Sequence, residues 1–297
     1  MTKKPKATKS SKSVPKAKGP ARGPLRQFSI PKSEQGTVKQ RVAALTEAPL
    51  DLCKSDKNLQ VALKILRSKD EPVKVRLAAL QSLQAATFSV VEFASCRTDY
   101  LATLREIAED PDPELRQRVL GILARDKDRF AQKKLLEGLQ NPQQALLPPE
   151  KALQLLSYDV HSEAYSAARE IVSKPPNPIA KREALRLLAA DASAAPMFEK
   201  ILRDKSELRE NRQISASALQ ALNPEKLQEH AREMLLDKSE YVDIQATSLT
   251  ALSQFGDQEA AAKDEALLKS VDRLSSKSSK ASTKTKQSAR RFLSKYK

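Results

Sequence analysis

An apolar helix pattern recurs along this chain at nearly constant spacing, and its clearest copies are "DEPVKVRLAAL" (70–80) and "DPDPELRQRVL" (110–120). Each copy has apolar residues five before, usually one before, at, and three after a leucine that we call the anchor. The anchors are separated by 30 to 40 residues and are Leu45, Leu80, Leu120, Leu153, Leu185, Leu219 and Leu249. Self-similarity at such a period is typical of proteins built from stacked supersecondary units.

Another amphipathic helix is predicted between each pair of neighbouring anchors, because apolar residues recur there at helical spacing. We call it the first helix of a pair, and the anchor helix that follows it the second helix. The predicted segments are 58–68, 100–110, 130–140, 163–173, 195–204 and 227–237. Prolines in the intervening turns stop one helix and preset the first turn of the next. One such helix pair cannot bury its apolar face alone, whereas stacked pairs share a continuous core. The sequence therefore predicts an all-α protein, a right-handed α-solenoid of about seven helix pairs over residues 37–268.

Composition supports an all-α fold. There are 6 glycines, no tryptophan and only 4% aromatic residues, while good helix formers dominate the middle of the chain. The alternating runs of β-branched and aromatic residues that would indicate strands are missing. No apolar stretch is long enough to span a membrane, and the basic N-terminus lacks the apolar core of a secretory signal. Cys53 and Cys96 are expected to be free thiols of a cytoplasmic protein.

The positive charge is concentrated at the two ends. Of the net charge of +16, residues 1–36 contribute +9 and residues 269–297 another +9, so the middle is close to −2. Residues 1–36 are predicted to be a disordered basic tail, because they contain almost no apolar side chains. Residues 269–297 are predicted to form a basic linker, flexible over 275–286, followed by a terminal amphipathic helix.

The apolar side chains of that last predicted helix are Ala289, Phe292, Leu293 and Tyr296. Two roles remain open for it. It caps the open end of the stack, as terminal repeats do, or it lays the basic face formed by Arg290, Arg291 and Lys295 on an anionic surface.

The polar residues at the turns of the repeat resemble the sequence pattern of a known family. The pairs Asp70/Arg76 and Asp110/Arg116, together with the recurring Ala-Leu anchor, resemble the HEAT-like repeats, specifically the short repeats named after phycobilisome lyases. The resemblance implies that the aspartate caps the second helix of a pair and that the arginine pairs with an acid of a neighbouring repeat. We interpret these four residues as structural repeat joints. At the later anchors the position of the arginine is taken by Lys181, Ser215 and Gln245.

A search for reaction chemistry yields no catalytic, cofactor-binding or metal-ligating residue. None of the glycines forms a phosphate-binding loop motif. His161 and His230 lie on different repeats without Cys or carboxylate partners at metal-ligand spacing. We therefore expect a protein that is not an enzyme and has no cofactor. Bilin lyase-like activity, suggested by the repeat family, is a lesser alternative.

The second helix of each pair is expected to line the concave side of the solenoid. Its exposed positions include Arg118, Lys151, Arg182 and Arg186, which would form a basic stripe on adjacent repeats. One interpretation is an ordinary solvated face. The other is a ridge that binds an acidic protein, a peptide or a phosphate backbone, because guanidinium groups suit carboxylates and phosphates alike.

These observations favour a monomeric, non-enzymatic scaffold that binds another protein, for example an acidic one, along its ridge. The alternative is a protein that binds DNA or RNA non-specifically through its lysine-rich ends, since clustered cations give sequence-independent, salt-sensitive affinity.

Overall fold

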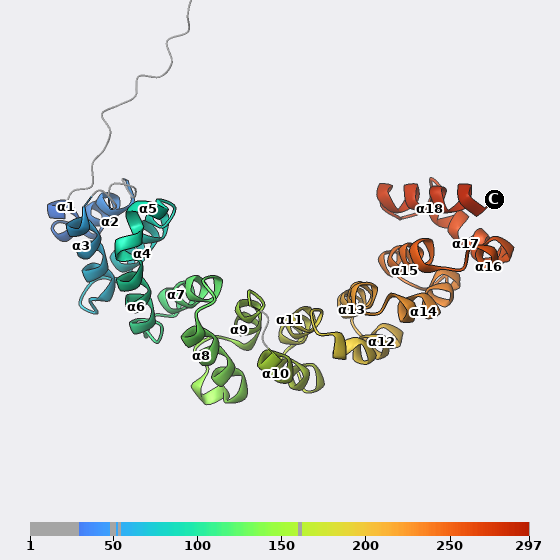
Figure 1. Ribbon diagram of the computed structural model, residues 1–297, viewed down its shortest axis with the longest axis horizontal. Coiled ribbons are helices and arrows are strands. Elements are labelled where there is room, and N and C mark those ends of the chain that lie inside the picture. Colours follow the sequence, from blue (N-terminus) through green and yellow to red (C-terminus); the bar gives the residue numbers. More distant parts are fainter. Residues whose placement is uncertain (1–29, 48–51, 53–54, 160–161, 297) are drawn as a thin grey trace, which may run out of the picture. The chain divides into compact units, whose positions relative to one another are not determined.

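A computed structural model describes residues 30–47, 52, 55–159 and 162–296 (Figure 1). Every regular element within these residues is an α-helix or a short 3-10 helix. The prediction of an all-α solenoid of helix pairs is thereby confirmed. The chain divides into two compact units, Met1–Tyr100 and Leu101–Lys297, which we call unit 1 and unit 2.

Unit 1 contains two stacked helix pairs followed by a short helical turn. Its helices are α1 (Ile30–Glu34), α2 (Val38–Thr46), α3 (Asp56–Arg67), α4 (Val73–Ala86), α5 (Val90–Phe93) and η2 (Ala94–Cys96). Helix α1 packs on α2 and α3 packs on α4, while α2 also contacts α4. The predicted anchors Leu45 and Leu80 lie in α2 and α4, and both are buried.

Helix α6 (Arg97–Glu106) starts in unit 1 and ends in unit 2, which then continues the alternation of first and second helices. The remaining helices of unit 2 are α7 (Pro113–Arg125), α8 (Arg129–Gln140), η3 (Pro142–Gln144), α9 (Pro149–Leu156), α10 (Ser162–Ser173), α11 (Pro178–Leu188), η4 (Ala192–Ala194), α12 (Ala195–Arg203), α13 (Arg209–Leu222), α14 (Pro224–Leu236), α15 (Val242–Phe255), α16 (Gln258–Lys263), α17 (Glu265–Ser275) and α18 (Thr283–Tyr296).

The second helices of unit 2 form a continuous row. Each of α7, α9, α11, α13, α15 and α18 contacts the next member of that series (Figure 1). Each second helix after α7 also packs against the first helix of its own pair: α8 on α9, α10 on α11, α12 on α13, α14 on α15 and α17 on α18. We call this series the second-helix row.

The apolar periodicity explains the core. All seven anchor leucines are at most 2% exposed, and the predicted first helices are observed with ends shifted by a few residues. Proline occupies the first helical position of α7, α9, α11 and α14, where its missing N–H costs nothing. Asp112, Asn177 and Asn223 cap three of these helices by accepting a backbone N–H with their side chains.

The predicted domain limits differ from the observed helices at both ends. Most of the tail predicted over 1–36 lies outside the described residues, and its last part contains α1. The limit predicted at residue 268 falls inside α17, and α18 begins at Thr283, within the predicted flexible linker. Helices α17 and α18 form a further helix pair, in which Ala289, Phe292 and Leu293 are buried.

No single helix in the described part of the chain combines the length and the apolar composition needed to cross a membrane. One bent pair of helical segments, Val73–Ala86 with Val90–Glu106, is together long and apolar enough, a result that rests on length and composition alone.

Candidate binding surfaces

The residues predicted to form the ridge lie on three neighbouring helices of the second-helix row. Arg118 lies on α7, Lys151 on α9, and Arg182 and Arg186 on α11. Arg118, Lys151 and Arg186 are exposed, and Arg182 is half-buried. The four residues therefore lie on three helices that contact one another in succession.

The positive charge of this ridge is largely matched by nearby carboxylates. Arg118 pairs with Glu114 at 2.7 Å and Arg186 pairs with Glu183 at 2.7 Å, each within its own helix. Arg182 reaches Glu210 of α13 at 2.8 Å, and this hydrogen bond raises the pKa of the Arg182 guanidinium. Lys151 has no ion-pair partner among the described residues. The ridge consequently consists of three oriented guanidinium groups matched by carboxylates, together with the ammonium group of Lys151.

The aspartates expected to cap helices do so less directly than the family resemblance implies. Helix α7 is capped by Asp112, whose carboxylate accepts the N–H of Leu115 at 2.8 Å. Asp110 is buried and accepts the N–H of Asp112, so it shapes the turn before the cap. Asp70 is exposed, and α4 begins after Pro72 without a side-chain cap. The expectation that Asp70 and Asp110 are the caps is therefore wrong, because the turn places proline or Asp112 at the cap position.

The arginines of these joints donate to backbone carbonyls of a neighbouring helix end or turn. Arg76 is buried and its Nε donates to the carbonyl of Leu66 at 3.0 Å, near the end of α3. Arg116 donates to the carbonyl of Asp110 at 2.7 Å and to that of Leu146, in the next turn, at 2.7 Å. Carbonyls at a helix end lack intrahelical partners, so a guanidinium that satisfies them stabilises the joint.

The same joint occurs elsewhere, always at the fourth residue of a second helix. Arg41 of α2 donates to the carbonyl of Ser33 at 2.8 Å and to Glu71 at 2.7 Å. Arg212 of α13 donates to the carbonyl of Leu202 at 2.9 Å. The residue equivalent to Arg76 in this repeat is thus Arg212 rather than Ser215.

Acids of the following repeat complete three of these joints. Each of these acids lies two residues before a second helix. The ion pairs are Arg41–Glu71, Lys181–Glu207 and Arg212–Glu240. Burial raises the pKa of Glu207, but hydrogen bonds from Lys181 and Asn211 outweigh it, so that pKa lies below its ordinary value. We call these basic and acidic pairs the joint ladder.

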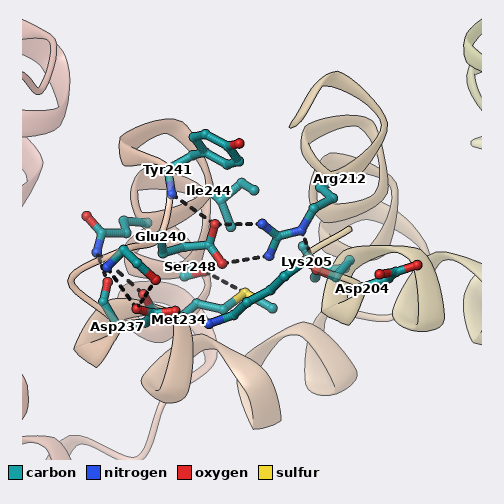
Figure 2. Close-up of polar contacts among 12 residues, drawn as sticks. Asp204, Lys205, Arg212, Met234, Asp237, Glu240, Tyr241, Ile244 and Ser248 are labelled. Carbon is teal, nitrogen blue, oxygen red and sulfur yellow. Dashed lines mark hydrogen bonds and ion pairs between the residues drawn. The ribbon is translucent and has the colours of Figure 1, made fainter. Parts of the chain in front are cut away.

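The most deeply buried of these three ion pairs joins α13 to the turn before α15 (Figure 2). Arg212 and Glu240 meet through two parallel bonds of 2.9 and 2.6 Å, and their side chains are 4% and 2% exposed. Glu240 also accepts the N–H of Tyr241 at 2.9 Å, where α15 begins. Both partners are thus satisfied by hydrogen bonds, which a buried ion pair requires.

A groove that the sequence did not predict lies between α13, α15 and α18. Its larger part has a volume of about 430 Å³ and its smaller part about 230 Å³, and Thr250 and Ser288 line both. Lys280, Lys284, Arg291 and Lys295 lie along its length. The walls are mostly hydroxyl and amide side chains, and the polar lining residues are Gln213, Gln220, Thr247, Thr250, Ser253, Gln254, Ser282, Thr285 and Ser288. We call this feature the C-terminal groove.

Four cations of this groove, Lys280, Lys284, Arg291 and Lys295, have no acidic partner among the described residues. The only acid in the lining, Asp243, already pairs with Arg209 at 2.9 Å. Many other basic side chains of unit 2 form ion pairs with acids, as Arg105 does with Asp128 and Lys134 does with Glu109. No Asp or Glu follows Asp272 in the chain, so this end keeps its positive charge.

The residues considered for metal or nucleophilic chemistry are separated in the structure. His230 hydrogen-bonds to Glu199 of α12 at 2.7 Å, while His161 and Cys53 lie outside the described residues. Cys96 is buried, and burial raises the pKa of its thiol. Within the described residues no group of three or more His, Cys, Asp or Glu side chains could hold a metal ion.

Comparison with known proteins gives structural likeness only. No protein-family model matches the chain, and no curated protein matches it. It is similar to human deoxyhypusine hydroxylase, with 15% identity and a TM-score of 0.36, over 84% of this chain and 99% of that chain. It is also similar to the complex of CpcE and CpcF of phycocyanin lyase from a Nostoc species, with 16% identity and a TM-score of 0.30, over 97% of this chain and 100% of that chain.

The prediction that this chain is not an enzyme is contradicted by these comparisons, because both similar structures are named as a hydroxylase and a lyase. At these identities and TM-scores the likeness assigns no reaction.

Proposed function

We propose that this chain is a helical-repeat scaffold that binds another protein along the second-helix row of unit 2. The supporting observation is the row itself, in which helices from α7 to α15 contact one another in succession. Stacked repeats present equivalent positions at regular intervals and bind partners along such extended surfaces. Arg118, Arg182 and Arg186, held by neighbouring glutamates, offer oriented guanidinium groups to the carboxylates of an acidic segment.

The test is affinity capture from a nuclease-treated extract at low and high salt, followed by measurement of the captured partner's affinity. We expect Arg118→Ala, Lys151→Ala, Arg182→Ala and Arg186→Ala together to weaken binding about tenfold or more, as loss of central arginine contacts does. The matched control replaces four exposed cations on or beside the first helices, namely Lys174, Lys200, Arg203 and Lys238. Unchanged affinity of the ridge variant, or a partner retained only through nucleic acid, would contradict the proposal.

A second candidate function is nucleic-acid binding through the basic ends, favoured by the segregation of charge. Residues 1–36 and 269–297 each carry +9. Such clusters bind polyanions mainly through counterion release, so affinity falls steeply with salt. Replacing the Lys and Arg residues of both ends by Gln, which keeps α17 and α18 in place, should abolish nucleic-acid binding and leave the binding of a protein partner on α7, α9 and α11 intact.

We further propose that the helix pairs are short HEAT-like repeats, supported by the joint ladder at the fourth residue of the second helices. A cytoplasmic location and a monomeric state remain predictions. Bilin lyase-like activity also remains a prediction, and a pigment-dependent spectral change with a bilin-bearing partner would reveal it.

A further inference from the structure

The C-terminal groove combines three properties that the other surfaces of unit 2 do not share in the described residues. It is a continuous depression, it carries cations without acidic partners, and its walls are rich in hydroxyl and amide groups. By contrast, the groove between α8 and α10 is lined mainly by apolar residues such as Leu139, Pro142 and Ile171. The ridge cations Arg118, Arg182 and Arg186 already have carboxylate partners.

We propose that the C-terminal groove binds the phosphodiester backbone of single-stranded nucleic acid without reading its sequence. This inference rests on the second of the proposed functions and deepens it, because it assigns the binding to a built surface rather than to tail charge alone. A phosphodiester chain carries a regular negative charge, which Lys280, Lys284, Arg291 and Lys295 would meet at intervals along the groove.

The lining residues match phosphate oxygens. Ser, Thr, Gln and Tyr side chains share with Lys and Arg the contacts that proteins make to nucleic-acid backbones. Ser282 begins α18 by accepting the N–H of Thr285 at 3.1 Å, which places the hydroxyl-rich first turn of that helix at the groove. The first turn of α18 contains no acidic residue that would oppose an anion.

The chemistry of the walls favours nucleic acid over an acidic peptide. Peptide-binding grooves generally anchor apolar or aromatic side chains in pockets, and these anchors supply most of the binding energy. The larger part of the groove has only Val242 and Ala246 as apolar lining residues. A flexible single strand can follow such a groove, and Tyr296 at the other end gives one base a stacking partner.

The test measures binding of the full chain to a fluorescent single-stranded oligothymidylate by anisotropy at several salt concentrations. The groove variant is Lys280→Gln, Lys284→Gln, Arg291→Gln and Lys295→Gln. The slope of log affinity against log salt is negative, and each lost phosphate contact reduces its magnitude by about 0.7. We therefore expect the magnitude of this slope to decrease by about 3 in the groove variant. The control variant, with Lys174, Lys200, Arg203 and Lys238 changed to Gln, should keep a slope within about 1 of the unmodified chain.

A second variant fills the groove without changing its charge. Thr250→Phe places a ring where the two parts of the groove adjoin, and we expect it to weaken oligothymidylate binding about tenfold, in line with the loss of several backbone contacts. Circular dichroism checks that the variant retains its helices. If Thr250→Phe binds like the unmodified chain, the strand lies outside the groove and the inference is overturned.

The remaining outcomes distinguish the groove assignment from the more general proposal that the chain binds nucleic acid. If the unmodified chain binds and the groove and control variants both bind equally well, nucleic-acid binding stands and the groove assignment is wrong. If the unmodified chain does not bind even at low salt, both are wrong. A polyglutamate of equal charge that competes as well as the oligonucleotide would show that the groove prefers acidic proteins and would overturn the assignment to nucleic acid.

Discussion

Arg212 of α13 and Glu240, two residues before α15, form a doubly hydrogen-bonded ion pair with both side chains almost fully buried. The same guanidinium bonds the carbonyl of Leu202 at the end of α12. One side chain therefore links the two helices of its own pair and the start of the next pair's second helix. Arg41, the fourth residue of α2, makes the same two kinds of contact, with the carbonyl of Ser33 and with Glu71.

Removing the acid of this pair should be among the more damaging single changes. Glu240→Ala leaves Arg212 buried without a counter-charge, and such a change costs about 3–5 kcal/mol. Urea unfolding followed by circular dichroism measures the free energy of unfolding.

The control for this prediction is Glu259→Ala, because the ion pair of Glu259 with Lys263 is exposed on both sides. It should cost less than about 1 kcal/mol. Arg212→Met combined with Glu240→Leu should cost less than Glu240→Ala alone, since no unpaired charge is left. A loss below about 1 kcal/mol for Glu240→Ala would mean that the pair is open to water.

Stability should depend on Asp237 at low pH. Hydrogen bonds from Lys205, then from the hydroxyl and N–H of Ser239, lower the pKa of Asp237 from 3.8 to about 2 (Figure 2). Because the folded pKa is below the ordinary value, this interaction stabilises the fold above about pH 4 and is lost as the pH falls towards 2. Urea midpoints measured across this range should show the loss.

Lys205→Met isolates the effect, since it removes the first of these hydrogen bonds. The difference in urea midpoint between the unmodified chain and this variant should be constant above pH 4 and shrink as the pH approaches 2. A difference that stays the same throughout this range would show that Asp237 titrates normally.

The position of the helix caps can be tested by two aspartates with different roles. Asp112→Ala removes the side-chain acceptor for the N–H of Leu115 and should cost about 1 kcal/mol. Asp70→Ala changes an exposed side chain that caps no helix, and its effect should stay within about 0.5 kcal/mol. If thermal unfolding showed a larger loss of stability for Asp70→Ala than for Asp112→Ala, Asp70 would be a helix cap after all.

Helix α18 should contribute to the stability of the stack. Phe292 is 3% exposed and lies on the apolar face of α18, so Phe292→Ala should cost about 3–5 kcal/mol of unfolding free energy. Ser294→Ala on the exposed face is the matched control and should be close to neutral. Equal, small losses for both changes would indicate that α18 does not pack on α15 and α17.

The apolar periodicity predicts the helices well, but it does not fix the register within one turn. In α4, α7 and α11 the anchor is the eighth residue of the helix, whereas in α13 that position is the fully buried Ala216 and the leucine of the pattern, Leu219, comes three residues later. The pattern centred on Leu219 therefore predicts the joint at Ser215 rather than at Arg212. The signal that would have corrected it is the acid two residues before the helix, since Glu207 precedes α13 as Glu71 precedes α4.

The surfaces were harder to predict than the core. The pair of Glu114 with Arg118 follows from i,i+4 spacing, but the contact of Arg182 with Glu210 depends on the packing of α11 against α13. Lysine-rich composition suggested a linker over 275–286, although the cap at Ser282 marks the start of α18. The C-terminal groove needs three helices in place, so no local pattern indicates it.

The joint ladder has a consequence for how this chain opens. Lys181–Glu207 and Arg212–Glu240 follow each other directly, so α11, α13 and α15 are tied in sequence. The fourth residue of α9 is Ala152, which cannot form such a tie. Because each repeat is stabilised mainly by its neighbours, residues 178–255 should exchange their amide hydrogens as one slow cooperative block, while the helices around α9 fluctuate open more often.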